Sequence, residues 1–130
     1  MPGPLSGCKV IELAHIMAGP VAGLMLADMG AEVIKVEKPG GDESRRMAPP
    51  AVNGESAAYM MVNRGKRGIC IDLRRAAGRA VMLKLLADAD VLIENHRRGV
   101  MAKLGLGHAQ LQAVNPGLIY LEILSLIHIS

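Results

Sequence analysis

Short apolar runs and stretches of helical spacing alternate along the chain. The runs are rich in β-branched residues and end at charged residues or turn formers, which is typical of strands inside a sheet. This pattern predicts strands at residues 8–13, 32–37, 68–73, 91–93 and 118–123.

The segments between these runs have helical character. Pro20 suits the first turn of a helix, where its missing N–H is no loss, and Gly30 suits a helix end. Between them, apolar residues at positions 21, 24, 25 and 29 recur at helical spacing. Further helices are predicted at residues 76–88, 100–104 and 109–114.

Residues 38–56 interrupt the pattern with many turn formers, among them Pro49-Pro50 and Asn53-Gly54. A connection of this length inside a compact domain is usually functional or mobile. Outside it, strands and helices alternate, and the first strand, helix and strand occupy about 30 residues, the usual size of a βαβ unit. The chain is therefore expected to have an α/β fold with a mostly parallel sheet.

Several turns that follow strands carry polar chemistry. Ligands of open α/β sheets bind outside the carboxyl ends of the strands, and helix starts there favour phosphate. Residues 15–20 form the first such turn, residues 72–75 follow the third strand, and residues 94–99 follow the fourth. Asp72 is a candidate helix cap. Arg74 and Arg75 are unfavourable beside a helix start, which hints at a bound anion.

Each turn alone is equally compatible with a solvated surface, and the G-x-G-x-x-G fingerprint of dinucleotide binding is absent. Their coincidence at strand ends favours a ligand with several phosphates. Charge points the same way: residues 64–103 carry a net charge of +6, against −2 for residues 1–63 and −1 for residues 104–130. A local positive field attracts anions.

Other classes of function find little support in the sequence. Two tyrosines are the only aromatic residues, which disfavours a nucleic-acid surface built on base stacking. Cys8 and Cys70 are expected to be buried free thiols. No membrane span, secretion signal, metal-ligand cluster or nucleophile motif is visible, so we expect a cytoplasmic protein without metal or membrane contact. His15, Asp42 and Glu43 are interpreted as structural or solvated.

The same segments resemble family III coenzyme A transferases, the CaiB/BaiF type, which include formyl-CoA transferases and α-methylacyl-CoA racemases. Four ordered landmarks carry the resemblance, which covers residues 4 to about 123. They are residues 4–37 (with AGP at 18–20 and LADMGAEVIKVE at 26–37), 63–72 (NRGKRGICID), 94–107 (ENHRRGVMAKLGLG) and 115–120 (NPGLIY).

The resemblance implies a Rossmann-like large domain, of which residues 1–123 would form the amino-terminal part, in an interlocked homodimer. It implies acyl-CoA and a small carboxylic acid as substrates, with no permanently bound cofactor. It also places coenzyme A contacts at Met17, Ala18, Lys38, Ile71, Asp72, Leu73, Arg74, Asn95, His96, Arg97 and Lys103.

Some features depart from the family pattern. Met17 stands where formyl-CoA transferases often have glutamine, which argues against oxalate or formate as substrate. The run RRGVM at 97–101 resembles racemases, whereas His15 resembles transferases. The main interpretation is an acyl-CoA:carboxylate CoA-transferase. An α-methylacyl-CoA racemase and a non-catalytic nucleotide-binding module are the alternatives.

The end of the chain also departs from the family. By resemblance, the aspartate that forms mixed anhydrides with the acyl group lies beyond residue 130. The family continues its last strand with a glycine turn of the Ser-Gly-Phe-Gly type, whereas residues 124–130 read LSLIHIS. This heptapeptide resembles a translated sequencing adapter, so we expect residues 124–130 to be a non-native tail.

Overall fold

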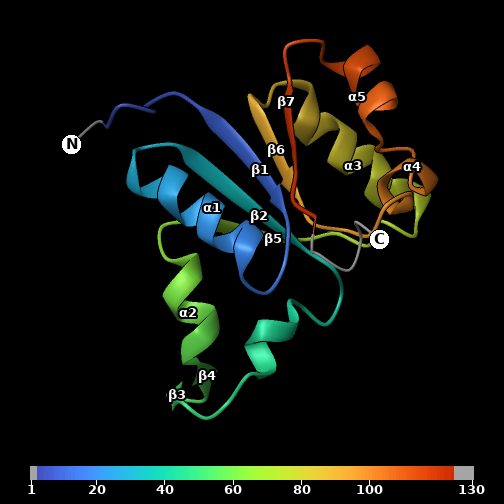
Figure 1. Ribbon diagram of the computed structural model, residues 1–130. Coiled ribbons are helices and arrows are strands. Elements are labelled where there is room, and N and C mark those ends of the chain that lie inside the picture. Colours follow the sequence, from blue (N-terminus) through green and yellow to red (C-terminus); the bar gives the residue numbers. More distant parts are fainter. Residues whose placement is uncertain (1–2, 125–130) are drawn as a thin grey trace.

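A computed structural model describes residues 3–124 and places the predicted strands in one parallel sheet (Figure 1). The sheet order is β5-β2-β1-β6-β7, and every neighbouring pair is parallel. Counted by sheet strands alone, this is the order 3-2-1-4-5 that Rossmann folds share. The expected α/β, Rossmann-like fold is confirmed. The strands are β1 (Lys9–Leu13), β2 (Glu32–Glu37), β5 (Arg67–Cys70), β6 (Val91–Glu94) and β7 (Ile119–Glu122).

Helices cover both faces of the sheet (Figure 1). One face packs against α1 (Ala18–Asp28), and the other against α3 (Ala76–Ala87), α4 (Val100–Lys103) and α5 (His108–Val114). Strand β1 shows the alternation that this requires: Val10 and Ala14 join the core under α1, and Ile11 and Leu13 join the core under α3. The first strand is therefore buried on both sides.

Small residues form the buried side of α1. Gly19, Pro20 and Gly23 are buried there, whereas Met25 is 58% exposed, so the apolar residues at helical spacing do not mark the buried face. The reason is a close approach to the sheet: a Cβ at Gly23 would lie 1.8 Å from Oε1 of Glu12. Helix α1 therefore packs directly against the Glu12 carboxylate.

The long connection after β2 contains more structure than the sequence indicated. A 3-10 turn, η1 (Glu43–Arg46), is followed by a small hairpin of β3 (Ala51–Val52) and β4 (Glu55–Ser56). Helix α2 (Ala57–Asn63) comes next and was not predicted; it lies against α1, away from the sheet (Figure 1). Ser56 caps it by accepting a hydrogen bond from the Tyr59 N–H.

Two local expectations need correction, and a third concerns residues that the structure mostly does not describe. Asp72 does not cap α3, which begins after Arg75; its side chain accepts from the Arg74 N–H within the preceding turn. The thiols are not buried, since Cys8 is half-buried and Cys70 is exposed. Apart from Leu124, the expected tail at 124–130 lies outside the described residues. Within residues 3–124, every helix is too short or too polar to cross a membrane.

Candidate functional site

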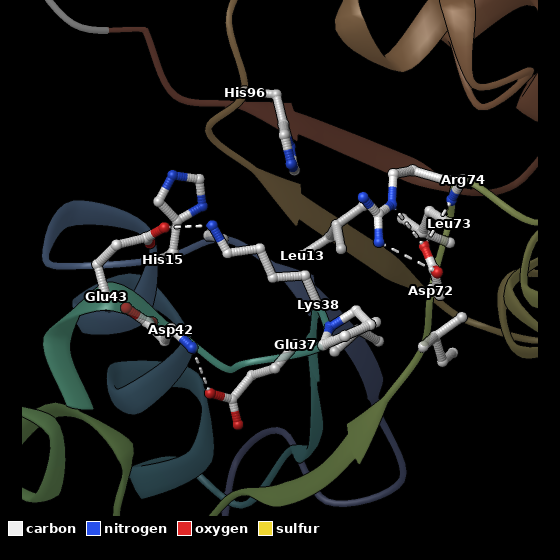
Figure 2. Close-up of a pocket in the computed structure, with 14 residues that line it drawn as sticks. Leu13, His15, Glu37, Lys38, Asp42, Glu43, Asp72, Leu73, Arg74 and His96 are labelled. Carbon is white, nitrogen blue, oxygen red and sulfur yellow. Dashed lines mark hydrogen bonds and ion pairs between the residues drawn. The ribbon is translucent and has the colours of Figure 1, made fainter. Parts of the chain in front are cut away.

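A cavity of about 470 Å³ opens where four parallel strands end (Figure 2). Its lining comes from residues 13–15 at the end of β1, 36–39 at the end of β2, 71–74 after β5 and His96 after β6, together with residues 42 and 43. The turns that the sequence singled out after β1, β5 and β6 therefore meet at one edge of the sheet. That edge is where open α/β folds bind ligands.

The cavity spans the point where the strand order reverses, between β1 and β6. Asn95 ties the two turns together there: its Oδ1 accepts from the His15 N–H at 3.2 Å, and its Nδ2 donates to the His15 carbonyl at 2.8 Å. His15 and His96 approach edge to face with ring centroids 5.6 Å apart. Burial, together with the neighbouring His96, lowers the pKa of His15. The lowered pKa favours the neutral form of His15, and the two imidazoles line the cavity side by side.

The cations of this cavity have acidic neighbours. Lys38 pairs with Glu43, beside His15 (Figure 2). On the opposite wall, Nε of Arg74 lies 3.1 Å from Oδ1 of Asp72, and Arg75 approaches the same carboxylate at 3.5 Å. Asp72 thus offsets the unfavourable position of the two arginines, so their placement is no longer an independent sign of a bound anion. The side chain of Arg74 remains 82% exposed and open to a second partner.

Behind the cavity lies a buried network of charges, which the sequence analysis did not anticipate. Nζ of Lys35 lies 3.0 Å from Oε2 of Glu12 and 2.9 Å from Oδ2 of Asp42. Nζ of Lys66 lies 2.7 Å from Oε1 of Glu12. All four side chains are at most 2% exposed. Asp42 had been interpreted as solvated; its burial corrects that interpretation.

Asp42 is held ionised by this environment. Burial by itself would raise the pKa of its carboxyl, but hydrogen bonds from the Ser44 N–H and the Lys35 ammonium outweigh it and lower the pKa to about 2. The Ser44 hydroxyl contributes a further bond of 2.8 Å. Burial lowers the pKa of Lys66, against the opposing effect of Glu12. The network therefore carries its charges in compensating pairs.

A second set of contacts fixes the start of the long connection. Arg45 forms a bidentate pair with Glu37, at 2.8 and 2.7 Å, and lies 4.0 Å from the ring centroid of Tyr59. The Tyr59 hydroxyl donates to Glu37 at 3.2 Å. Burial and the neighbouring Glu37 raise the pKa of Tyr59 to about 12. Residues 37–45 and α2 are thereby joined into one wall beside the cavity.

A second cavity of about 290 Å³ lies at the ends of β6 and β7. The buried Glu94 accepts from the His96 N–H at 2.8 Å and from the Tyr120 hydroxyl at 3.3 Å. Arg97 lies at the rim of this second cavity. Among residues 3–124, Arg97 and Lys103 pair with no acidic side chain.

The structure brings together only part of the predicted contact set. The first cavity is lined by six of its members: Lys38, Ile71, Asp72, Leu73, Arg74 and His96. Within the described residues, Met17, Ala18, Asn95 and Lys103 line neither cavity. Met17 and Ala18 are exposed at the start of α1, and Asn95 acts on the backbone of His15. Lys103 is exposed on α4.

Sequence reasoning missed Glu12, Lys35, Asp42 and Lys66. A signal existed for the first two, since each lies within an apolar strand. A charged side chain inside a strand that is buried on both faces requires a charged or hydrogen-bonding partner. Asp42 and Lys66 lie in turns, where charged residues are ordinarily exposed, so their burial could not be inferred without the packing of α1 and η1.

The strand order, the cavity at the switch point and the polar turns around it define an α/β protein of the Rossmann-like class with a candidate site at the strand ends. The sequence profile of CoA-transferase family III matches residues 5–125. The chain belongs to this family.

Several similar proteins are named as CoA-transferases or as CAIB/BAIF family proteins. The chain is 52% identical over 127 residues to a succinate–glutarate CoA-transferase of Agrobacterium fabrum, covering 92% of this chain and 32% of that protein. It is 41% identical over 121 residues to the human succinyl-CoA:glutarate CoA-transferase, covering 92% and 28%. A crystal structure of a CAIB/BAIF family protein from Brucella suis superposes with a TM-score of 0.90 at 48% identity, covering 94% of this chain and 33% of that one. The chain thus spans about a third of the length of these relatives.

Proposed function

We propose that this chain forms the coenzyme A-binding, amino-terminal portion of an acyl-CoA:carboxylate CoA-transferase. The observation that carries the proposal is the cavity at the ends of β1, β2, β5 and β6, in a chain that belongs to a family of CoA-transferases. The names of its relatives favour succinyl-CoA as donor and a dicarboxylate such as glutarate as acceptor.

Coenzyme A would occupy the first cavity and the adjoining turns. The apolar side chains of Ile71 and Leu73 line one wall and suit the adenosine or pantetheine parts of the ligand. Arg74 is exposed, and its planar guanidinium can donate hydrogen bonds to phosphate oxygens as a second partner beside Asp72. Arg97 and Lys103 follow β6 and add positive charge that the phosphates of coenzyme A can meet.

The transfer itself needs a nucleophile. In the proposed reaction, an aspartate carboxylate attacks the thioester carbonyl of the acyl-CoA and releases the coenzyme A thiolate, leaving a mixed anhydride. The cavity lining contains Asp42 and Asp72, but the first is buried in ion pairs and the second is engaged by two arginines. We therefore assign the nucleophile to the part of the relatives that this chain does not span.

Binding is tested directly by calorimetry of coenzyme A with the 130-residue chain, with ADP as the comparison ligand, which lacks both pantetheine and the 3′-phosphate. Tighter binding of coenzyme A than of ADP is expected, and it should weaken as salt is added, because phosphate contacts are screened. Equal affinity for the two ligands would favour a general nucleotide-binding module, and no binding of either would overturn the proposal.

Activity is tested with a chimera in which residues 1–123 replace the matching part of the Agrobacterium fabrum relative. We expect the chimera to transfer coenzyme A from succinyl-CoA to glutarate, and the 130-residue chain alone to show no turnover. A folded chimera that binds coenzyme A without transferring it would contradict the assignment of this chain to a transferase. Turnover by the homogeneous 130-residue chain would contradict the placement of the nucleophile.

A further inference from the structure

The turn between β1 and α1 is held through its backbone. Lys35 donates to the Ala14 carbonyl at 3.0 Å, and Asn95 engages both the N–H and the carbonyl of His15. The Ile16 N–H donates to both carboxylate oxygens of Asp42, at 3.1 and 3.2 Å. The peptide groups of residues 14–16 are thus hydrogen-bonded to side chains from three separate parts of the fold.

Ile16 has a backbone conformation that its side chain disfavours. Its φ is 71°, in the left-handed region, where β-branched residues are rare. For such a residue other conformations are favoured by roughly tenfold when nothing opposes them. Conformations of this kind persist where the surroundings over-determine them, and they gather at ligand clamps. The carboxylate of Asp42, which accepts hydrogen bonds from the Ile16 N–H, opposes relaxation here.

Stability alone does not account for so many buried charges. Ion pairs taken out of water are often no better than well-packed apolar side chains, because desolvation offsets the attraction. The contacts of this network with the backbone give it another use. Lys35 and Asp42 form hydrogen bonds with the backbone of the β1–α1 turn. Lys66 donates to the Pro20 carbonyl at 2.7 Å, in the first turn of α1.

We propose that Asp42, backed by Lys35, is a positioning residue: it holds Ile16 in the left-handed conformation and so sets the β1–α1 turn for the acyl-CoA ligand. The inference rests on the proposed function, because the turn lines the cavity through Ala14 and His15. Asp42 acts through the backbone of Ile16 and does not itself react.

A double-mutant cycle separates this role from a purely structural one. Asp42→Ala should weaken coenzyme A binding to the 130-residue chain about tenfold, because the turn then leaves the competent conformation. Ile16→Gly alone should change affinity by less than about threefold, since glycine adopts the left-handed region freely. In the double variant, affinity should return to within about threefold of the unsubstituted chain, because glycine restores access to that conformation.

The thermal midpoint should behave differently from the affinity. It should fall in Asp42→Ala and stay low in the double variant, because Lys35 has lost the same partner in both. Recovery of affinity without recovery of stability supports positioning. Losses in affinity that simply add would overturn the proposal.

Two further measurements cover the remaining outcomes. If Asp42→Ala does not fold, Asp42→Asn replaces it. The amide keeps an oxygen for the Ile16 N–H, so affinity for coenzyme A should stay within about threefold while stability falls. A loss of affinity of about tenfold or more would overturn the proposal.

If the unsubstituted chain binds no coenzyme A, the proposed function fails, and amide hydrogen exchange at Ile16 decides the positioning role by itself. Exchange there should accelerate at least about tenfold in the Asp42 variant, and unchanged exchange would overturn the inference.

Discussion

Arg74 is the residue through which the proposed phosphate contact can be tested most directly. A charge-assisted hydrogen bond contributes about 1.5–3 kcal/mol, and the competing pair with Asp72 places the expected effect at the lower end. Arg74→Ala should therefore weaken coenzyme A binding about tenfold in calorimetry. Lys103→Ala should have a smaller effect, since lysine binds phosphate as a point charge.

Lys84→Ala is the matched control for this experiment. Lys84 is exposed on α3 and does not line the first cavity, yet its removal changes the net charge equally. The affinity of the Lys84→Ala variant for coenzyme A should stay close to that of the unsubstituted chain. Equal affinities of the Arg74 and Lys84 variants would assign the basic residues of this region to a solvated surface.

Asp42 also makes stability depend on pH. Its pKa in the folded chain, about 2, lies below its ordinary value of 3.8, so its contribution is present above pH 3.8 and is lost as pH falls toward 2. The difference corresponds to about 2 kcal/mol. The free energy of unfolding in urea should therefore fall by about that much more in the unsubstituted chain than in Asp42→Asn between about pH 5 and pH 2. Parallel pH profiles for the two proteins would contradict the ionised, paired state of Asp42.

For single residues, the sequence predicted which turns form the candidate site better than it predicted the roles of individual side chains. Lys38, Arg74 and His96 do line one cavity, because parallel strands bring their carboxyl ends to one edge whatever the details of packing. Asp42 was misjudged because its burial depends on contacts with Lys35, with Ser44 of η1 and with the turn before α1. A charge with partners 7 and 26 residues away along the chain leaves no local pattern to detect.

Among the elements, the strands of the main sheet and the longer helices were predictable because short apolar runs alternate regularly with segments of helical character. Strand β6 and helix α3 end within one residue of the expected bounds. Helix α2 was missed although Ser56 and Asn53-Gly54 offered a cap and a hairpin turn. Its seven residues pack against α1 and not on the sheet, so their apolar spacing carries little information.

The contact between α1 and β1 gives a prediction for Gly23. Alanine normally favours a helix over glycine by about 1 kcal/mol. Here the added Cβ would meet Glu12, whose carboxylate is confined between Lys35 and Lys66, so Gly23→Ala should lower the free energy of unfolding by about 1–3 kcal/mol. Gly68→Ala is the control, because its Cβ would meet open space. A stabilised Gly23→Ala protein would show that the helix can move off the carboxylate.

For the molecule as a whole, the edges of the sheet are the weak point. Every residue of β5 is exposed, and on β7 the side chain of Ile119 is 63% exposed. Unpaired strand edges with apolar side chains invite pairing between chains. We expect the 130-residue chain to self-associate in sedimentation experiments at micromolar concentration.

A charge on the edge should reduce this association. Ile119→Lys is expected to shift the distribution toward monomer, because lysine disfavours edge-to-edge pairing. Val81→Lys provides the comparison, since Val81 is 43% exposed on α3, away from either edge strand. A chain that is monomeric without substitution, or that responds equally to both changes, would exclude the edges as the cause.

The first cavity is assembled entirely from residues 13–96. In relatives about three times as long as this chain, the corresponding segment leaves the ribosome while most of the polypeptide is still being made, at about 5–20 residues per second. The first cavity can then form on the nascent chain before the rest of the polypeptide has been made. Under the proposed function, coenzyme A would favour folding of the growing chain, since a ligand that binds only the folded state stabilises that state.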